Sequence, residues 1–145
     1  MVDEEDPGRE AWMLLFQLFR SQRREVAALQ SDIGLNMAQV HLLKSLDKPG
    51  GNPMSELAEA LFCDASYITG LVDKLEDRGL VQRLPNPDDR RVKLIALTPA
   101  GAAAQEEVSR RLSRPPPFIE SLPLEDKRAL RDIFKKASRS LQEQA

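Results

Sequence analysis

The chain has 145 residues, 41% of them hydrophobic and 30% charged, and its formal net charge at pH 7 is −2. This balance is typical of a globular protein, and the net charge argues neither for nor against a nucleic-acid partner, because a polyanion can bind a local positive patch. An apolar run of the roughly 20 residues that cross a bilayer, a secretory leader and a second cysteine are all absent, so we expect a cytoplasmic protein that does not bind a membrane.

Residues 9–31 show the periodicity of one long helix. Its main apolar stripe, at spacings of three, four and seven, consists of Ala11, Leu15, Leu18, Phe19, Val26 and Leu29. Trp12, Leu14 and Phe16 lie off this stripe, so the first three turns are apolar on nearly all sides, unlike a surface helix. Such a helix is either buried in its own core or covered by a second subunit. We favour the second subunit, because a chain of this size has little core to cover it.

A second helix is predicted from Asn36, where Asn36 and Gln39 have the spacing of a capping box. Turn-forming residues end it at positions 49–53. Its inner face consists of Val40, Leu43 and Leu46.

Two further helices follow in quick succession. Ser55 is the expected N-cap of the first, SELAEALF, and Asp64 that of the second, ASYITGLVDKLEDR. Gly79 is placed to end the second helix in a left-handed conformation. A short connection followed by a longer helix is the helix-turn-helix pattern.

The period then changes from 3.6 to 2. Residues 80–84 and 92–97 are predicted as strands, and the turn formers of Pro85-Asn86-Pro87-Asp88-Asp89-Arg90-Arg91 lie between them. A hairpin with a charged tip after a helix-turn-helix makes a winged helix. Thr98 then caps a helix from Pro99 to about Ser113, and a last helix is predicted over about 124–141. The apolar stripe of this last helix consists of Leu130, Ile133, Phe134, Ala137 and Leu141.

Five segments in this order and spacing resemble the MarR family of transcription regulators. They are Met54-Ser55-Glu56-Leu57-Ala58, Leu71-Val72-Asp73-Lys74-Leu75-Glu76, Arg78-Gly79-Leu80-Val81, Asn86-Pro87-Asp88-Asp89-Arg90-Arg91 and Leu97-Thr98-Pro99-Ala100-Gly101. The resemblance implies a homodimer. The expected fold is mainly α (α+β), a winged helix-turn-helix with flanking dimerisation helices. We expect one domain over 1–145, with a DNA-binding lobe at 34–98 and helical dimerisation regions at 9–33 and 99–145.

The helix after Asp64 is the expected DNA-reading helix. Its predicted buried face is Ile68, Leu71, Val72 and Leu75, and its opposite face carries Ser66, Tyr67, Thr69, Gly70, Asp73 and Lys74. Hydroxyl groups and Lys74 can contact phosphates or base edges. Gly70 stands where the resemblance implies a long basic residue. Either the helix backbone comes close to DNA there, or Thr69 and Lys74 read more of the site.

The wing tip carries the second set of DNA-binding candidates. By resemblance, Arg91 is the wing-tip arginine, which a narrow A·T-rich minor groove attracts, and Asp64 is the acidic residue that braces it. Asp89 is expected to stabilise the turn, and Arg90 is a further contact candidate. An ordinary charged turn is the alternative. Catalysis by Asp88 and Asp89 is not expected, because no pocket is implied around an exposed turn.

Control of DNA binding is predicted less directly. The resemblance implies a pocket for a small aromatic or amphipathic ligand between the dimer helices and the lobe, for which Trp12, Phe16 and His41 are candidates. Cys63 is expected to pack as a small hydrophobic residue beside Ile68, with a redox switch as the alternative. No metal site and no cofactor are expected.

The predicted function is therefore that of a non-enzymatic, sequence-specific regulator of transcription, a repressor released by a small ligand. Its predicted partners are a second copy of the chain and a palindromic double-stranded operator. The alternatives are a redox-sensing regulator acting through Cys63 and a winged helix used only for protein–protein contact.

Overall fold

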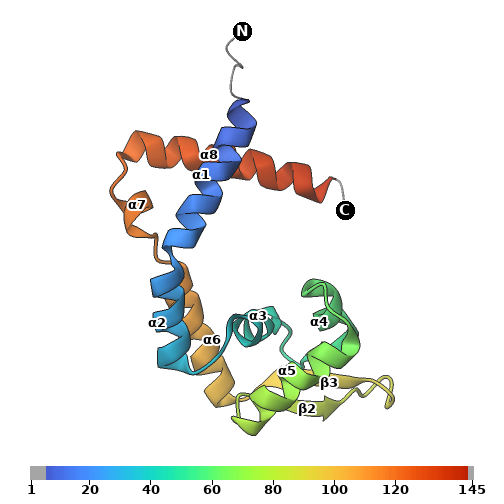
Figure 1. Ribbon diagram of the computed structural model, residues 1–145. Coiled ribbons are helices and arrows are strands. Elements are labelled where there is room, and N and C mark those ends of the chain that lie inside the picture. The colour runs from blue at the N-terminus through green and yellow to red at the C-terminus, as the bar shows by residue number, and fades with distance from the viewer. Residues whose placement is uncertain (1–5, 144–145) are drawn as a thin grey trace. The chain divides into compact units, whose positions relative to one another are not determined.

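The computed structural model (Figure 1) describes residues 6–143, except the side chains at positions 141 and 142. The chain forms two compact units, residues 1–112 and residues 113–145. The predicted domain boundaries at residues 34 and 98 remain a prediction. In the first unit the helices are α1 (Pro7–Ser21), α2 (Arg23–Ile33), α3 (Met37–Ser45), α4 (Met54–Ala60), α5 (Ala65–Asp77) and α6 (Pro99–Leu112).

Three antiparallel strands complete the first unit. β1 (Asn52–Pro53) and β2 (Val81–Pro85) both pair with β3 (Lys93–Leu97), in the order β1-β3-β2. Arg83 lies opposite Ile95 in the hairpin, and Asn52 also lies opposite Ile95 on its other edge. The predicted hairpin is confirmed, and so is the mainly helical winged helix-turn-helix fold. β1 was not predicted, because two residues are too short to show a period.

One hydrophobic core lies under these elements. α3 contributes Val40, Leu42 and Leu43, and α6 contributes Val108, so the core draws on α6 as well as on the lobe. The full set of buried core residues is Leu35, Val40, Leu42, Leu43, Leu46, Leu57, Ile68, Leu71, Val72, Leu75, Leu80, Val81, Ile95 and Val108.

The predicted long helix over residues 9–31 is two helices, and the single-helix prediction was wrong. Gln22 separates α1 from α2 with φ −81° and ψ 2°, and its N–H bonds back to Phe19. The Ser21 hydroxyl donates to the Leu18 carbonyl at 2.6 Å, an alternative to regular helix bonding. Apolar periodicity continues across such a break, because one residue with altered ψ hardly changes which side chains share a face.

Three of the four predicted N-caps, those at Asn36, Asp64 and Thr98, are confirmed, and the fourth, at Ser55, is wrong. The capping box of α3 is present: Gln39 N–H donates to the Asn36 side chain and Asn36 N–H to the Gln39 side chain, both at 2.9 Å. Asp64 caps α5 by accepting from Tyr67 N–H at 2.8 Å. Ser55 is not an N-cap, because α4 begins one residue earlier, at Met54, directly after the strand β1.

α4 ends in a Schellman motif with an unusual residue in it. The N–H of Cys63 donates to the Ala58 carbonyl at 3.0 Å, and that of Phe62 to the Glu59 carbonyl at 3.1 Å. This geometry requires a left-handed residue, which is usually glycine, and here it is Phe62 at φ +51°. A left-handed conformation costs an L-residue with a Cβ about 1–2 kcal/mol.

The corner between β3 and α6 explains the Leu-Thr-Pro-x-Gly segment. The Thr98 hydroxyl accepts from Gly101 N–H at 3.0 Å and donates to the Gly79 carbonyl at 2.5 Å, so it joins the end of α5 to the start of α6. A Cβ on Gly101 would lie 1.7 Å from the carbonyl oxygen of Leu80. Only glycine therefore fits at position 101, and Gly79, at φ +70°, ends α5 as predicted.

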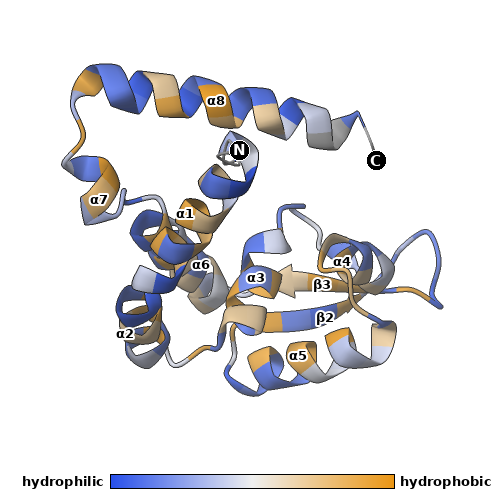
Figure 2. Ribbon diagram, turned by 45° about the horizontal axis from the view of Figure 1, so that its top comes forward, coloured by the Kyte–Doolittle hydropathy of each residue, from blue (hydrophilic) through white to orange (hydrophobic). Residues whose placement is uncertain are grey.

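The second unit consists of α7 (Pro117–Glu120) and α8 (Leu124–Gln142). The Lys127 ammonium donates to the Glu120 carbonyl at 2.6 Å and so joins the two helices. α7 was not predicted, because one turn framed by prolines has no readable period. Hydrophobic residues recur along α8 (Figure 2), and Ile133 and Phe134 among them are exposed. The side chain of Leu141, predicted for the same stripe, lies outside the described residues.

Candidate nucleic-acid interface

α5 presents one apolar and one polar face, as predicted. Ile68, Val72 and Leu75 are fully buried and Leu71 nearly so, which anchors the helix on the core. The predicted reading face is exposed along its whole length, and it consists of Ser66, Tyr67, Thr69, Gly70, Asp73 and Lys74. Nothing lies within 4 Å of where a Cβ on Gly70 would be, so this position faces open space.

Several polar atoms of this face already have partners within the helix. The Ser66 hydroxyl donates to the Asp64 carboxylate at 2.7 Å, and the Thr69 hydroxyl donates to the Ala65 carbonyl at 2.9 Å. The hydrogen bond from Ser66, followed by that from Tyr67 N–H, lowers the pKa of Asp64 below its ordinary value of 3.8. Both hydroxyl oxygens retain lone pairs, so against DNA they can act as acceptors from base amino groups.

A charged cluster joins the wing to α5. The Arg83 guanidinium on β2 donates to Asp73 at 2.5 Å and to Glu76 at 2.7 Å, and Arg83 N–H also donates to Glu76 at 3.2 Å. The hydrogen bond to Asp73 is the main reason that the pKa of Arg83 is raised. The cluster neutralises part of the negative charge on the reading face and holds the base of the wing against α5. The sequence does not predict this cluster, because Arg83 lies seven and ten residues from Glu76 and Asp73, on a different element.

A second arginine ties the end of α5 to α2. Arg78 donates through one nitrogen to the Ile33 carbonyl at 2.9 Å and through the other to the Gly34 carbonyl. These carbonyls close α2 and have no partner within the helix, and the C-terminal end of a helix attracts a cation. Arg78 therefore links the reading helix to a helix of the predicted dimerisation region.

The wing tip extends away from the body of the lobe in both views (Figures 1 and 2). Asp89 accepts from Arg91 N–H at 3.0 Å and stabilises the turn, and its carboxylate lies 3.7 Å from the Arg91 guanidinium. The Arg91 side chain is 95% exposed. The Asp64 carboxylate accepts from the Ser66 hydroxyl and from Tyr67 N–H, and among the described residues the ion pair of Arg91 is with Asp89. Bracing of the wing by Asp64 remains a prediction.

The comparisons with known proteins agree with this geometry. The family model described as the MarR family matches residues 35–93, which include α3, α4, α5 and β2. The multiple antibiotic resistance protein MarR of Salmonella typhimurium is 32% identical over 98 residues, 68% of each chain. The chain belongs to the MarR family. The HTH-type transcriptional repressor MdtR of Bacillus subtilis is 36% identical over 91 residues, which are 63% of this chain. The matched part of the chain spans 59% of the length of MdtR.

Solved structures of this family share the fold. The YusO protein of Bacillus subtilis superimposes with a TM-score of 0.74 at 28% identity, covering 94% of this chain and 98% of YusO. CouR of Rhodococcus jostii RHA1, solved bound to p-coumaroyl-CoA, superimposes with a TM-score of 0.68 at 28% identity, covering 92% of this chain and 95% of CouR.

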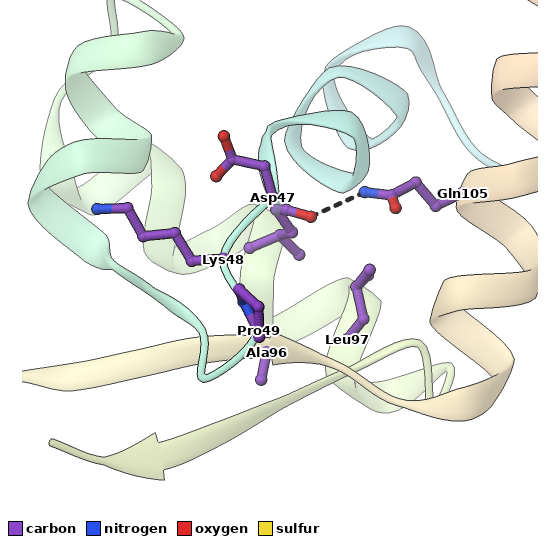
Figure 3. Close-up of a pocket in the computed structure, with 7 residues that line it drawn as sticks. Asp47, Lys48, Pro49, Ala96, Leu97 and Gln105 are labelled. Carbon is purple, nitrogen blue, oxygen red and sulfur yellow. Dashed lines mark hydrogen bonds between the residues drawn. The ribbon is translucent and has the colours of Figure 1, made fainter. Parts of the chain in front are cut away.

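The residues predicted to line the MarR-type ligand pocket are exposed. Trp12 and Phe16 lie on α1 and are more than half exposed, and His41 is exposed on α3. A cavity of about 310 Å³ lies elsewhere, between the loop after α3, β3 and α6 (Figure 3). Its residues are Leu46, Asp47, Lys48, Pro49, Ala96, Leu97 and Gln105.

The polar groups around this cavity already have partners within the protein. The Gln105 amide donates to the Leu46 carbonyl at 2.9 Å (Figure 3). It also donates to the Leu43 carbonyl at 2.6 Å and thereby caps the end of α3. The Lys48 ammonium is paired with Glu56 at 2.7 Å, and Asp47 accepts from the Asn52 amide at 2.9 Å. These groups therefore join α3 to α6, and we assign no ligand to the cavity.

Three further kinds of site were considered from the sequence: a redox-active cysteine, a metal site and a membrane-spanning helix. Cys63 is half-buried, packs against the core that includes Ile68, and its thiol donates to the Leu61 carbonyl at 3.0 Å. Among the residues that the structure describes, no three His, Cys, Asp or Glu side chains gather where they could hold a metal ion. Within the same part of the chain, no helix is both long and apolar enough to span a membrane.

Proposed function

We propose that this MarR-family chain is a homodimeric repressor that binds a palindromic double-stranded DNA operator and is released by a small aromatic or amphipathic ligand. The observation that supports DNA binding is the exposed polar face of α5 beside a wing that Arg83 joins to α5 and whose tip presents Arg90 and Arg91. The chain's net charge of −2 does not oppose this, because the wing is locally positive: it carries Arg83, Arg90, Arg91 and Lys93 against Asp88 and Asp89.

α5 and the wing tip are suited to different grooves of DNA. α5 is the element that fits the major groove, where Tyr67, Thr69 and Lys74 reach base edges and phosphates. The wing tip is suited to the adjacent minor groove, whose narrow A·T-rich form attracts Arg91. A two-fold dimer places two such helices about 34 Å apart, which predicts an imperfect palindrome of roughly 16–20 base pairs.

The homodimer is supported by the apolar surface of α1. Among the described residues of α1 none is buried, although Trp12 and Phe19 are large and apolar, at 64% and 73% exposed. Exposed apolar surface of this extent marks an interaction site. In the second unit α8 likewise leaves Leu124, Ile133 and Phe134 exposed.

Release by a ligand is favoured over oxidation of Cys63. CouR is a structural relative that binds an aromatic acyl-CoA, whereas the Cys63 thiol is half-buried and bonded to its own backbone. The residues Trp12, Phe16 and His41 gain a cavity only if a second subunit covers α1. Peroxide treatment of the protein–DNA complex, compared with that of Cys63→Ser, distinguishes the routes. Release of the wild-type protein alone would make the thiol the sensor.

The test of the main proposal is selection of bound duplexes from random DNA, followed by binding measurements with Arg91→Ala. We expect affinity to fall by about 1–3 kcal/mol, most strongly where the wing covers A·T pairs. Arg139→Ala, the same change on α8, is the matched control and should leave affinity unchanged. Failure of the wild-type protein to enrich any duplex would contradict DNA binding. Unchanged affinity for Arg91→Ala would show that the tip is only a charged turn.

A further inference from the structure

Phe62 is the one large side chain of the lobe that the fold leaves unexplained. It is 97% exposed, more than any other large hydrophobic residue described. Its backbone occupies the left-handed region, at φ +51°, the only residue other than glycine described there. The side chain therefore contributes no packing to the chain, and its Cβ makes the backbone conformation less favourable.

The backbone of Phe62 has a clear structural role that needs no side chain. Its N–H and that of Cys63 close α4 through the Glu59 and Ala58 carbonyls, and glycine would do this without strain. The apolar partner of the motif is Cys63, which packs against the core. A strained residue with an exposed ring at a position suited to glycine indicates that the ring itself has a use.

The position of Phe62 indicates what that use is. It lies two residues before Asp64, the N-cap of α5, and so at the end of the reading helix that helix-turn-helix proteins direct at base edges. Tyr67, half-exposed, follows in the first turns of the same helix. Gly70, one turn further on, has no side chain to contact DNA. An apolar ring at this end can contact the C5-methyl group of thymine in the major groove.

We infer that Phe62 is a specificity-determining residue that contacts a thymine methyl group in each operator half-site. This inference rests on the proposed DNA-binding function. It accounts for a phenylalanine in a left-handed turn, because the strain is offset only when DNA covers the ring. A protein partner for the ring is the competing explanation.

The experiment uses the full-length protein and the operator recovered by selection. Each thymine is replaced in turn by uracil, which removes only the methyl group. The wild-type protein is expected to respond at one thymine of each half-site, and these two thymines are related by the two-fold symmetry. Its affinity should fall about fourfold for each buried methyl group that is removed. Phe62→Gly is expected to bind the thymine operator more weakly by at least the same factor and to show no difference between thymine and uracil there.

Two further measurements keep the result from being misread. The midpoint temperature of Phe62→Gly is expected to equal or exceed that of the wild type, since glycine relieves the left-handed strain, so weaker binding cannot be due to unfolding. Phe62→Asn, which tolerates the same backbone conformation but is polar, should behave like Phe62→Gly on DNA.

Equal affinity of the wild type and Phe62→Gly for the thymine operator, or the same response to uracil in both, would overturn the inference. Unchanged DNA binding combined with impaired repression in a transcription assay would overturn it in favour of a protein partner. If the wild-type protein enriches no duplex at all, the proposed function itself fails and the inference fails with it.

Discussion

α5 and α1 are both amphipathic helices of the first unit, and the fold treats their apolar faces in opposite ways. In α5, Ile68, Val72 and Leu75 are fully buried within the chain. In α1, no residue of the described helix is buried, and the aromatic rings of Trp12 and Phe19 lie mostly in solvent.

The difference shows which apolar side chains are buried within the chain and which are left for a second chain to cover. The winged-helix lobe closes its own core with α3, α5, the strands and Val108 of α6. α1 also has many apolar residues, but none of its residues is buried. Burying such residues is favourable by about 1.5–3 kcal/mol each, so α1 gains stability when a second chain covers it.

The largest expected effect is on assembly. Replacing Trp12 and Phe19 together by glutamate removes four aromatic side chains from a homodimer, about 6–12 kcal/mol of association free energy, which weakens the dimer by at least about 10⁴-fold. Sedimentation equilibrium measures this change. Phe62→Glu, at an even more exposed aromatic residue outside α1, is the control and should sediment as the wild type. A wild-type protein that sediments as a stable monomer at micromolar concentration would contradict the burial of α1 by a second chain.

The next effect concerns the closed core. Leu75→Ala removes a fully buried side chain of α5, and we expect the free energy of unfolding to fall by about 2–5 kcal/mol. Chemical denaturation monitored by circular dichroism measures it. Ala100→Gly, at an exposed position on α6, is a control that changes helix propensity only, by about 1 kcal/mol. A loss below that of the control would mean that α5 is not part of a tightly packed core.

A smaller effect tests the joint between wing and reading helix. Arg83→Met removes the bonds to Asp73 and Glu76, and we expect the free energy of unfolding to fall by about 0.5–1 kcal/mol, as for other partly exposed ion pairs. DNA affinity should fall by at least as much, because the wing is no longer held beside α5. Lys48→Met breaks the exposed pair with Glu56 and serves as control. Loss of stability with unchanged DNA affinity would refute a positioning role for Arg83.

The smallest effect is the pH dependence of the helix cap. The pKa of Asp64 is lowered in the folded protein, chiefly by the Ser66 hydroxyl and then by Tyr67 N–H. Its charged form therefore stabilises the fold above the ordinary pKa of 3.8, and this contribution is lost as the pH falls through the lower folded value. Thermal unfolding of Asp64→Ser should show a flatter profile than the wild type in this acidic range. Asp88→Ser, which removes a carboxylate but no cap, should follow the wild-type profile.

Much of the lobe was predicted from the sequence because its signals are local. The Asn36 box, the Asp64 cap and the stop at Gly79 each depend on residues within a turn of one another. The buried face of α5 follows from a spacing of three and four, and the hairpin follows from a period of two. The predictions that failed, at Gln22 and Ser55, concerned single-residue boundaries, where one backbone angle or one short strand decides the outcome.

The candidate interface was predicted only in part, for the same reason. The exposed positions of α5 and the wing arginines follow from the periods, and the structure places them as expected on the surface. Their partners do not follow. Arg83 meets Asp73 and Glu76 across two elements, which no period shows, and bracing of Arg91 by Asp64 remains a prediction.

By itself the sequence determined the order of the elements, the faces of the helices and the positions of the caps, since each of these is a property of neighbouring residues. Only the tertiary structure decided which distant groups meet. Arg78 reaches the end of α2 across 45 positions, Gln105 the end of α3 across 62, and Gly101 accommodates the Leu80 carbonyl. Each of these contacts depends on the lengths and relative orientations of several helices and strands. A pattern among neighbouring residues does not contain that information.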